Sequence, residues 1–190
     1  MKNVMVHKLA DVSASAHVGE GTRIWAWTQV MPSSVIGRDC NIGTHVTIDS
    51  NVVIGDTCKI QAGARVFGGA RVGNGVFIGP NVVLTDDKHP RAVNTDLTLK
   101  AKDDWIEEGV TVKDGASIGS MAVICPGVTI GEFAMVGAGS VVTKDVADQA
   151  LVYGNPARVH GRVCKCGELL PSESSEYINQ CEQCSRKEKS

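Results

Sequence analysis

The chain is poor in aromatic residues, has no excess of positive charge and lacks long apolar runs. Aromatics make up 4% of the 190 residues, so large rings do not fill its core. A net charge of −2 at pH 7 provides no basic patch or stripe of the kind that binds nucleic acid or a membrane surface. No stretch approaches the roughly 20 apolar residues of a membrane helix. We therefore expect neither a nucleic-acid nor a membrane partner.

The amino terminus, MKNVMVHKLADVSAS, lacks an apolar segment of signal-peptide length. This absence favours a cytoplasmic protein. At 20.1 kDa the chain has the size of one domain with a small appendage, which is enough to bury a continuous core.

Apolar residues, in contrast, recur with a strict period of six. From Val18 to Leu84 every sixth residue is apolar: Val18, Ile24, Val30, Ile36, Ile42, Ile48, Ile54, Ile60, Val66, Val72, Ile78 and Leu84. At 43% hydrophobic residues, such a run arises by chance with a probability on the order of 10⁻⁴. A second block, out of phase with the first, is expected from Ile106 to Ala147.

A period of six matches neither a helix nor a simple strand, but it matches a short strand plus a corner. Four places after most of the periodic residues stands a second small or β-branched residue, as at Cys40, Val46 and Ala64, so both positions point inward. Gly, Asn and Asp recur near the corners, where sharp bends suit them. Three hexads close an 18-residue coil, and coils stack with a rise of roughly 4.8 Å. The pattern predicts an all-β fold, a parallel β-helix of hexapeptide repeats, whereas an antiparallel sandwich would alternate with period two.

The segment LTDDKHPRAVNTDLTLKAKDDW interrupts the repeat between Leu84 and Trp105. We therefore predict a β-helix domain over residues 1–162 with a loop inserted at 85–105. A Cys-rich tail is predicted over residues 163–190.

The hexads, the interrupting loop and VYGNPARVHG after the last coil resemble the left-handed β-helix acyltransferases of the hexapeptide family. Within that family, TRIWAWTQV, KIQAGARVF and FIGPNVVLTDDKHPRA are similar to bacterial N-acetyltransferases that act on nucleotide-linked amino sugars for surface polysaccharide. The resemblance implies left-handed coils, a homotrimer, acetyl-CoA as the donor and active sites in the grooves between subunits.

The inserted loop is rich in titratable residues. Acyl transfer to an amine requires a base for the proton of the attacking nitrogen and donors for the oxyanion. His89 suits the role of base because an imidazole titrates near neutral pH, and its His-Pro pair resembles that of sugar O-acetyltransferases. Asp86 either is the base or orients His89, although the amino-sugar relatives carry Asn at this place and Asn-Pro in place of His-Pro. The alternative is that His89 is a solvated loop residue and that Asp86 and Asp87 belong to a turn.

Further candidate residues fall into an acceptor group and a donor group. The expected substrate-binding residues are Asn81, Gln61, Trp27 and Arg91. Trp27 would be either an exposed platform for a sugar or base, a subunit contact, or a residue packed against the N-terminal segment. By resemblance, the acetyl-CoA site includes Lys144, Pro156, Arg158, Gly137 and Ala138, with the cations near the CoA phosphates.

The seven cysteines form two populations. Cys40 and Cys58 lie 18 places apart in the same inward position and are expected in the core, and Cys125 stands alone. The other four form two close pairs, Cys164 with Cys166 and Cys181 with Cys184, which predict a Cys₄ zinc (Zn²⁺) knuckle. Two disulfides, which are disfavoured in the cytoplasm, or a tail with free thiols are the alternatives.

The predicted activity is acetyl-CoA-dependent N-acetylation of a nucleotide-linked amino sugar. An O-acetyltransferase acting on a sugar hydroxyl is the first alternative. The second is a trimeric β-helix protein that either has no catalytic activity or resembles γ-type carbonic anhydrases. Those enzymes need three histidines at a metal, and the five here show no paired spacing on adjacent coils.

Overall fold

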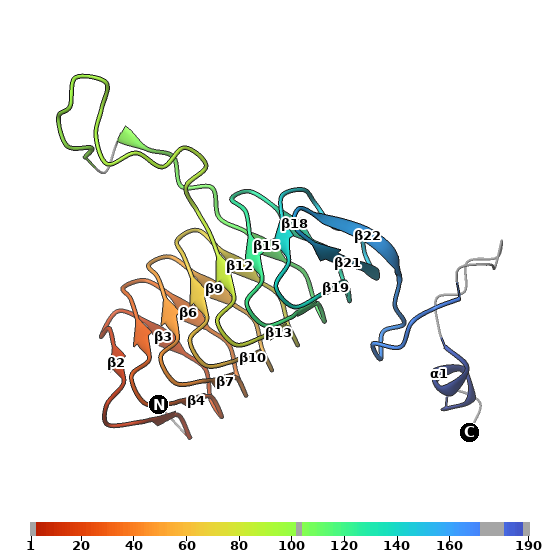
Figure 1. The fold of residues 1–190 in the computed structure, drawn as a ribbon. Helices are drawn as coiled ribbons and strands as arrows, with labels where there is room; N and C mark the ends of the chain where they lie inside the picture. The colour runs from red at the N-terminus through yellow and green to blue at the C-terminus, as the bar shows by residue number, and fades with distance from the viewer. Residues whose placement is uncertain (1–2, 102–103, 172–180, 188–190) are drawn as a thin grey trace.

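The computed structural model describes residues 3–101, 104–171 and 181–187. In it the chain winds into a three-sided prism of stacked coils, with a loop projecting from one edge and a short tail beyond the last coil (Figure 1). Each coil contributes one two-residue strand to each of three sheets, and equivalent strands of successive coils pair in parallel. The all-β, parallel β-helix prediction is confirmed.

We name the sheets A, B and C. Sheet A contains β1 (Met5–Val6), β4 (Arg23–Ile24), β7 (Asn41–Ile42), β10 (Lys59–Ile60), β13 (Phe77–Ile78), β16 (Ser117–Ile118), β19 (Met135–Val136), β21 (Ala150–Gly154) and β22 (Ala157–Arg162). Sheet B contains β2 (Asp11–Val12), β5 (Gln29–Val30), β8 (Thr47–Ile48), β11 (Arg65–Val66), β14 (Val83–Leu84), β17 (Val123–Ile124) and β20 (Val141–Val142). Sheet C contains β3 (His17–Val18), β6 (Val35–Ile36), β9 (Val53–Ile54), β12 (Arg71–Val72), β15 (Thr111–Val112) and β18 (Thr129–Ile130).

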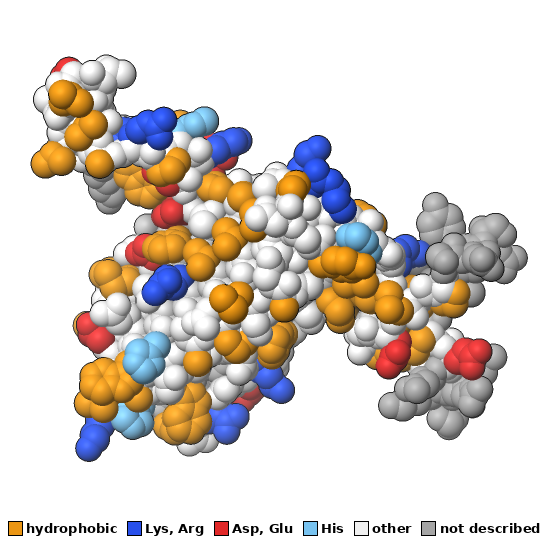
Figure 2. Space-filling view, viewed as in Figure 1, with side chains coloured by type: hydrophobic (Ala, Val, Ile, Leu, Met, Phe, Trp, Pro, Cys, Tyr) orange, Lys and Arg blue, Asp and Glu red, His pale blue; other side chains and the backbone are white. Residues whose placement is uncertain are grey.

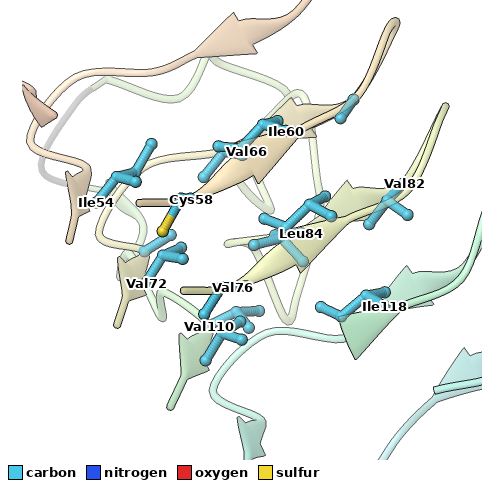
Figure 3. Packing of buried hydrophobic residues seen from close by; sticks show 14 of the residues in the cluster. Ile54, Cys58, Ile60, Val66, Val72, Val76, Val82, Leu84, Val110 and Ile118 are labelled. Atoms are coloured by element: carbon cyan, nitrogen blue, oxygen red, sulfur yellow. The ribbon is translucent and has the colours of Figure 1, made fainter. Parts of the chain in front are cut away.

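The core is a ladder of aliphatic side chains inside the prism. The second residue of nearly every strand points inward, and Ile24, Ile60 and Leu84 are fully buried. The second inward position predicted four places later is also buried, as Cys58 and Val76 show (Figure 3). Small and β-branched residues fill this narrow interior without large rings, which explains the low aromatic content.

The coils already include β1, which pairs in parallel with β4, so the repeat extends on the N-terminal side of Val18. One boundary differs from the sequence prediction. The second block does not begin at Ile106, whose side chain is 78% exposed; the core resumes at Val110 and Val112. The loop therefore extends beyond residue 105 and ends at the start of β15. Ile106 stands six places before Val112, but this spacing alone does not turn its side chain into the core.

Most corners of the coils are tight turns that place one residue in the left-handed region of backbone conformation. Glycine and asparagine adopt it readily. We call the corner between sheets A and B the A/B edge; its left-handed residues are Trp27, His45, Gly63, Asn81, Met121 and Gly139. The corner between sheets B and C is the B/C edge, and the inserted loop leaves from it, between β14 and β15.

A β-hairpin and a short helix end the described part of the chain. Strand β21 pairs in parallel with β19 and turns back into the antiparallel β22. The helix α1 (Glu182–Lys187) lies in the tail and was not predicted. In the part of the chain that the structure describes, no helix has both the length and the apolar character needed to cross a membrane.

Candidate functional site

The inserted loop is a structured arm. At its base the Thr85 hydroxyl donates to the Ile124 carbonyl (2.8 Å), and the Glu108 N–H donates to the Asp86 carbonyl (2.8 Å). Further out, Val93 and Leu99 form an antiparallel bridge. Figure 2 shows cationic, acidic and histidine side chains gathered along the arm. The base and the bridge give titratable side chains fixed positions, as a catalytic role would require.

Asp86 lies half-buried in a cleft of about 520 Å³ between the arm and the B/C edge. The residues that line this cleft are Asp49, Phe67, Asp86, Asp87, Arg91, Ala92, Lys100, Ala101 and Trp105. Burial raises the pKa of Asp86, and the negative charges of Asp49 and Asp87 raise it further. A carboxylate whose pKa is raised accepts a proton more readily near neutral pH, which is the property of a general base.

His89 lies in the open, on a smaller neighbouring cleft of about 190 Å³. Its backbone N–H donates to the Asp87 carboxylate (2.8 Å). In the described part of the chain no hydrogen bond joins the imidazole to Asp86; the two side chains line adjacent clefts that share Asp87, Lys100 and Trp105. The structure thus brings both predicted bases into one arm, as separate groups.

The predicted acceptor-binding residues divide between two edges. Arg91 lines the same cleft as Asp86. Trp27 and Asn81 lie at the A/B edge. Gln61 directly follows β10 and is the first residue of another corner of this edge, the one that contains Gly63. Sheet B separates this edge from the arm, so one chain does not bring the two groups together.

Most of the predicted donor residues also lie at the A/B edge, at its C-terminal end. Gly137 and Ala138 follow β19, and Tyr153 of the paired strand β21 packs so closely that a Cβ on Gly137 would lie 2.7 Å from its Cβ. The Gly154 N–H donates to the Ser140 hydroxyl (3.3 Å), which fixes the β21–β22 turn against this corner.

Two further donor residues lie in that hairpin, and one lies elsewhere. Pro156 follows a cis peptide bond in the turn, and Arg158 is exposed on β22. Lys144 follows β20 at the B/C edge and does not join them. The A/B edge thus carries acceptor candidates toward its N-terminal end and donor candidates at its C-terminal end.

The tail brings its four cysteines together. The Sγ atoms of Cys164, Cys166, Cys181 and Cys184 all lie within 4.8 Å of one another. Cys164 and Cys166 occupy a tight turn, closed by a hydrogen bond from the Gly167 N–H to the Cys164 carbonyl (2.8 Å). All seven cysteines are free thiols in this structure, so it contains neither of the two alternative disulfides. The six-residue pattern did not predict this cluster of four cysteines; the spacing of the cysteines in the sequence did.

Coils of this kind, with an arm at one edge, define a hexapeptide-repeat β-helix protein. The family described as "Bacterial transferase hexapeptide (six repeats)" matches residues 15–50, 51–86 and 109–144, together more than half of the chain. The chain belongs to this family, and the predicted membership is confirmed. The gap between the second and third matched segments coincides with the arm.

Two curated proteins show what kinds of enzyme the chain is similar to. It is 57% identical over 70 residues to the dTDP-3-amino-3,6-dideoxy-alpha-D-galactopyranose 3-N-acetyltransferase of Aneurinibacillus thermoaerophilus, covering 37% of this chain and 36% of that protein. It is 39% identical over 80 residues to the galactoside O-acetyltransferase of Escherichia coli K12, covering 42% and 37%. The chain thus spans little more than a third of the relatives that it matches.

Two solved structures share the fold. The polySia-specific acetyltransferase NeuO superimposes with a TM-score of 0.61 at 16% identity, over 100% of this chain and 86% of that one. The acetyltransferase domain of PglB from Neisseria gonorrhoeae does so with a TM-score of 0.54 at 24% identity, over 83% and 57%. At these identities the likeness concerns the fold alone.

Proposed function

We propose that the protein is an acetyl-CoA-dependent N-acetyltransferase that acts on the amino group of a nucleotide-linked amino sugar, as a step in making surface polysaccharide. The observation that supports it most is the A/B edge, where acceptor and donor candidates follow one another along one line of coils. The similarity to a dTDP-amino-sugar 3-N-acetyltransferase points to the same substrate class.

The reaction needs few groups from the protein. The sugar amine attacks the thioester carbonyl, a C–N bond forms, the C–S bond breaks and CoA leaves as a thiol. The base, His89 or Asp86, removes the proton that the nitrogen loses on attack. Arg91, beside Asp86, places a positive charge in the same cleft for an anionic group of the acceptor.

The proposed site requires more than one protomer. Sheet B separates the arm from the A/B edge within a chain, so an arm completes the site only by reaching the A/B edge of a neighbour. We propose a homotrimer, because a threefold ring gives each protomer one such neighbour on either side and closes on itself.

We expect size-exclusion chromatography with light scattering to give about 60 kDa, three chains of 20.1 kDa. The mass should not change with dilution over the range used for activity assays. An active monomer at those concentrations would contradict the shared site.

A thiol-release assay with acetyl-CoA tests the activity itself. The acceptors are UDP- and dTDP-linked amino sugars, with the matching hydroxyl sugars as controls. Release that requires the amino group supports the proposal. Release with the hydroxyl sugars would favour O-acetylation, to which the galactoside O-acetyltransferase match also points. With no release, and a melting temperature unchanged by acetyl-CoA, the protein would be a non-catalytic β-helix.

We also propose that the tail cysteines hold one structural Zn²⁺. Zinc–sulfur bonds of about 2.3 Å in a tetrahedron set the sulfur atoms roughly 3.8 Å apart. The Sγ atoms of Cys166 and Cys181 lie 3.5 Å apart, and the whole set lies within 4.8 Å. Four thiols at this spacing fit a closed site that holds the 163–190 segment together without catalysing a reaction.

A further inference from the structure

Three residues other than glycine and asparagine occupy left-handed corners of the A/B edge, Trp27, His45 and Met121, and Trp27 has the bulkiest side chain of the three. Gly63 and Asn81 occupy the left-handed corner positions at φ +73° and +56°, which suit them. Trp27 occupies the equivalent position at φ +62°. For a bulky residue this conformation is costly, and such strain is found most often where a functional site keeps it.

Among the residues that the structure describes, none covers the Trp27 ring in a way that would offset this strain. Phe133, another bulky residue at a left-handed corner, lies under the Lys165 ammonium, 5.0 Å from the ring centre. Trp27 remains 56% exposed, and the one ring it stacks on in the described part of the chain is His45 of the next coil, with 6.2 Å between centroids. Hydrophobic and histidine side chains gather at this end of the prism (Figure 2). Two flat rings left open to solvent form a platform on which a nucleobase can stack.

Positive charge follows the platform along the same edge. One coil beyond His45, Lys59 and Arg65 stand on the two sides of Gly63, on the outer faces of β10 and β11, and both are exposed. Neither forms an ion pair with a carboxylate in the described residues. Gly63 has no side chain between them, and one there would collide with the Asn81 carboxamide. Two cations that form no ion pair in the described residues, on either side of a residue without a side chain, suit a diphosphate.

The order and the spacing match one kind of ligand. Trp27, His45, Gly63 and Asn81 lie on four successive coils, so the edge spans roughly 14 Å at the usual strand spacing. Along it come an aromatic platform, a pair of cations and a hydrogen-bonding carboxamide. A nucleoside diphosphate sugar presents its base, its two phosphates and its sugar in the same order.

We infer that the A/B edge from Trp27 to Asn81 binds the nucleoside diphosphate part of the acceptor, with the base stacked on Trp27 and the diphosphate between Lys59 and Arg65. This assignment rests on the proposed function and specifies which part of the substrate each coil receives. It places the sugar at Asn81, with the donor residues farther along the edge.

Isothermal titration of the full chain with UDP and UMP tests the assignment. Trp27→Asn should weaken both ligands roughly 5- to 100-fold, the usual range for losing one stacked base. The double variant Lys59→Gln, Arg65→Gln should weaken UDP more than UMP and reduce the salt dependence of UDP binding. The matched control is Leu97→Asn, because Leu97 has φ +66° and is 80% exposed on the arm, outside both clefts.

Thermal melting then separates a binding role from a packing role. Asn tolerates the left-handed region, so Trp27→Asn and Leu97→Asn should both keep or raise the melting temperature. UDP that fails to bind, or that binds Trp27→Asn within about twofold of the parent, would overturn the inference. So would a fall in melting temperature large enough to account for the lost affinity.

Turnover distinguishes this inference from the proposed function. If amino sugars are acetylated and Trp27→Asn leaves KM for the acceptor unchanged, the function stands and the base-binding assignment is wrong. If UDP binding depends on Trp27 while no amino sugar is acetylated, the nucleotide site stands and the proposed function fails.

Discussion

Replacing His89 by alanine is expected to lower kcat by roughly 10²- to 10⁴-fold, the usual contribution of general acid–base catalysis, with little change in KM for acetyl-CoA. The arm holds His89 at the surface, where its backbone N–H donates to the Asp87 carboxylate, and the proposed shared site would bring a neighbour's acceptor to it. Steady-state kinetics of the purified full chain measure the effect. A kcat within about threefold of the parent would remove His89 as the base.

Asp86→Asn distinguishes the two candidate bases. If His89 is the base, the Asn variant should keep much of its activity, because no hydrogen bond joins Asp86 to His89 in the described part of the chain. If Asp86 is the base, the loss should equal or exceed that of His89→Ala. If both variants remain near the parent, the arm acts only as a lid, and the amine loses its proton to solvent or to the CoA sulfur.

The pH dependence provides a control for folding. Burial raises the pKa of Asp86, so the folded state holds this proton more tightly than the unfolded chain does. The resulting stabilisation is present at acid pH and is lost as the pH rises through the raised pKa. At neutral pH Asp86→Asn should therefore not lower the melting temperature, and any loss of rate is catalytic.

The rate profile identifies the base independently. With a histidine base, kcat/KM falls as the pH drops below neutrality. With Asp86 as the base the fall lies at more acid pH, although above the ordinary range of an aspartate.

The fold was predictable because one physical requirement repeats along the chain. Each strand from β1 to β20 is two residues long, and nearly every one turns its second residue inward; Ile42, Ile60 and Ile78 occupy that position on successive coils. The six-residue pattern gave the wrong start for the second block of coils, because Ile106 fits the period but belongs to the arm. Local periodicity cannot distinguish the last residue of a loop from the first residue of a coil.

The candidate site was predictable only in part. The arm was visible in the sequence because it breaks the period, and its acidic and histidine residues mark the chemistry. The division of the candidate residues between two edges of the prism was not visible in the sequence, because it depends on which corner each residue occupies. Lys144 and Arg158 are only 14 positions apart and yet lie on different edges. Strain at Trp27 is likewise a backbone property that the sequence does not show.

The tail cysteines allow a prediction that does not depend on catalysis. Metal analysis of protein purified without a His tag should find about one zinc per chain, because four thiolates at this spacing form a closed structural site. Cys181→Ser together with Cys184→Ser should abolish the bound zinc. Cys125→Ser, which changes a half-buried thiol on the coils, is the control and should keep it.

Loss of zinc should affect the tail far more than the prism. Val163 and Leu170 are buried, and the Val163 N–H donates to the Gln149 carbonyl (2.8 Å), so residues 163–170 remain attached to the last coil without the metal. Cys181 and α1 lie beside Cys164 and Cys166 where the four Sγ atoms cluster within 4.8 Å of one another, and the proposed zinc would join the two segments there. The double variant should therefore keep the circular dichroism of the β-helix and the parent's mass in solution while becoming sensitive to proteolysis after residue 170. Metal-replete protein that lacks zinc, with all four tail thiols reacting freely with a thiol reagent, would show that these cysteines form no metal site.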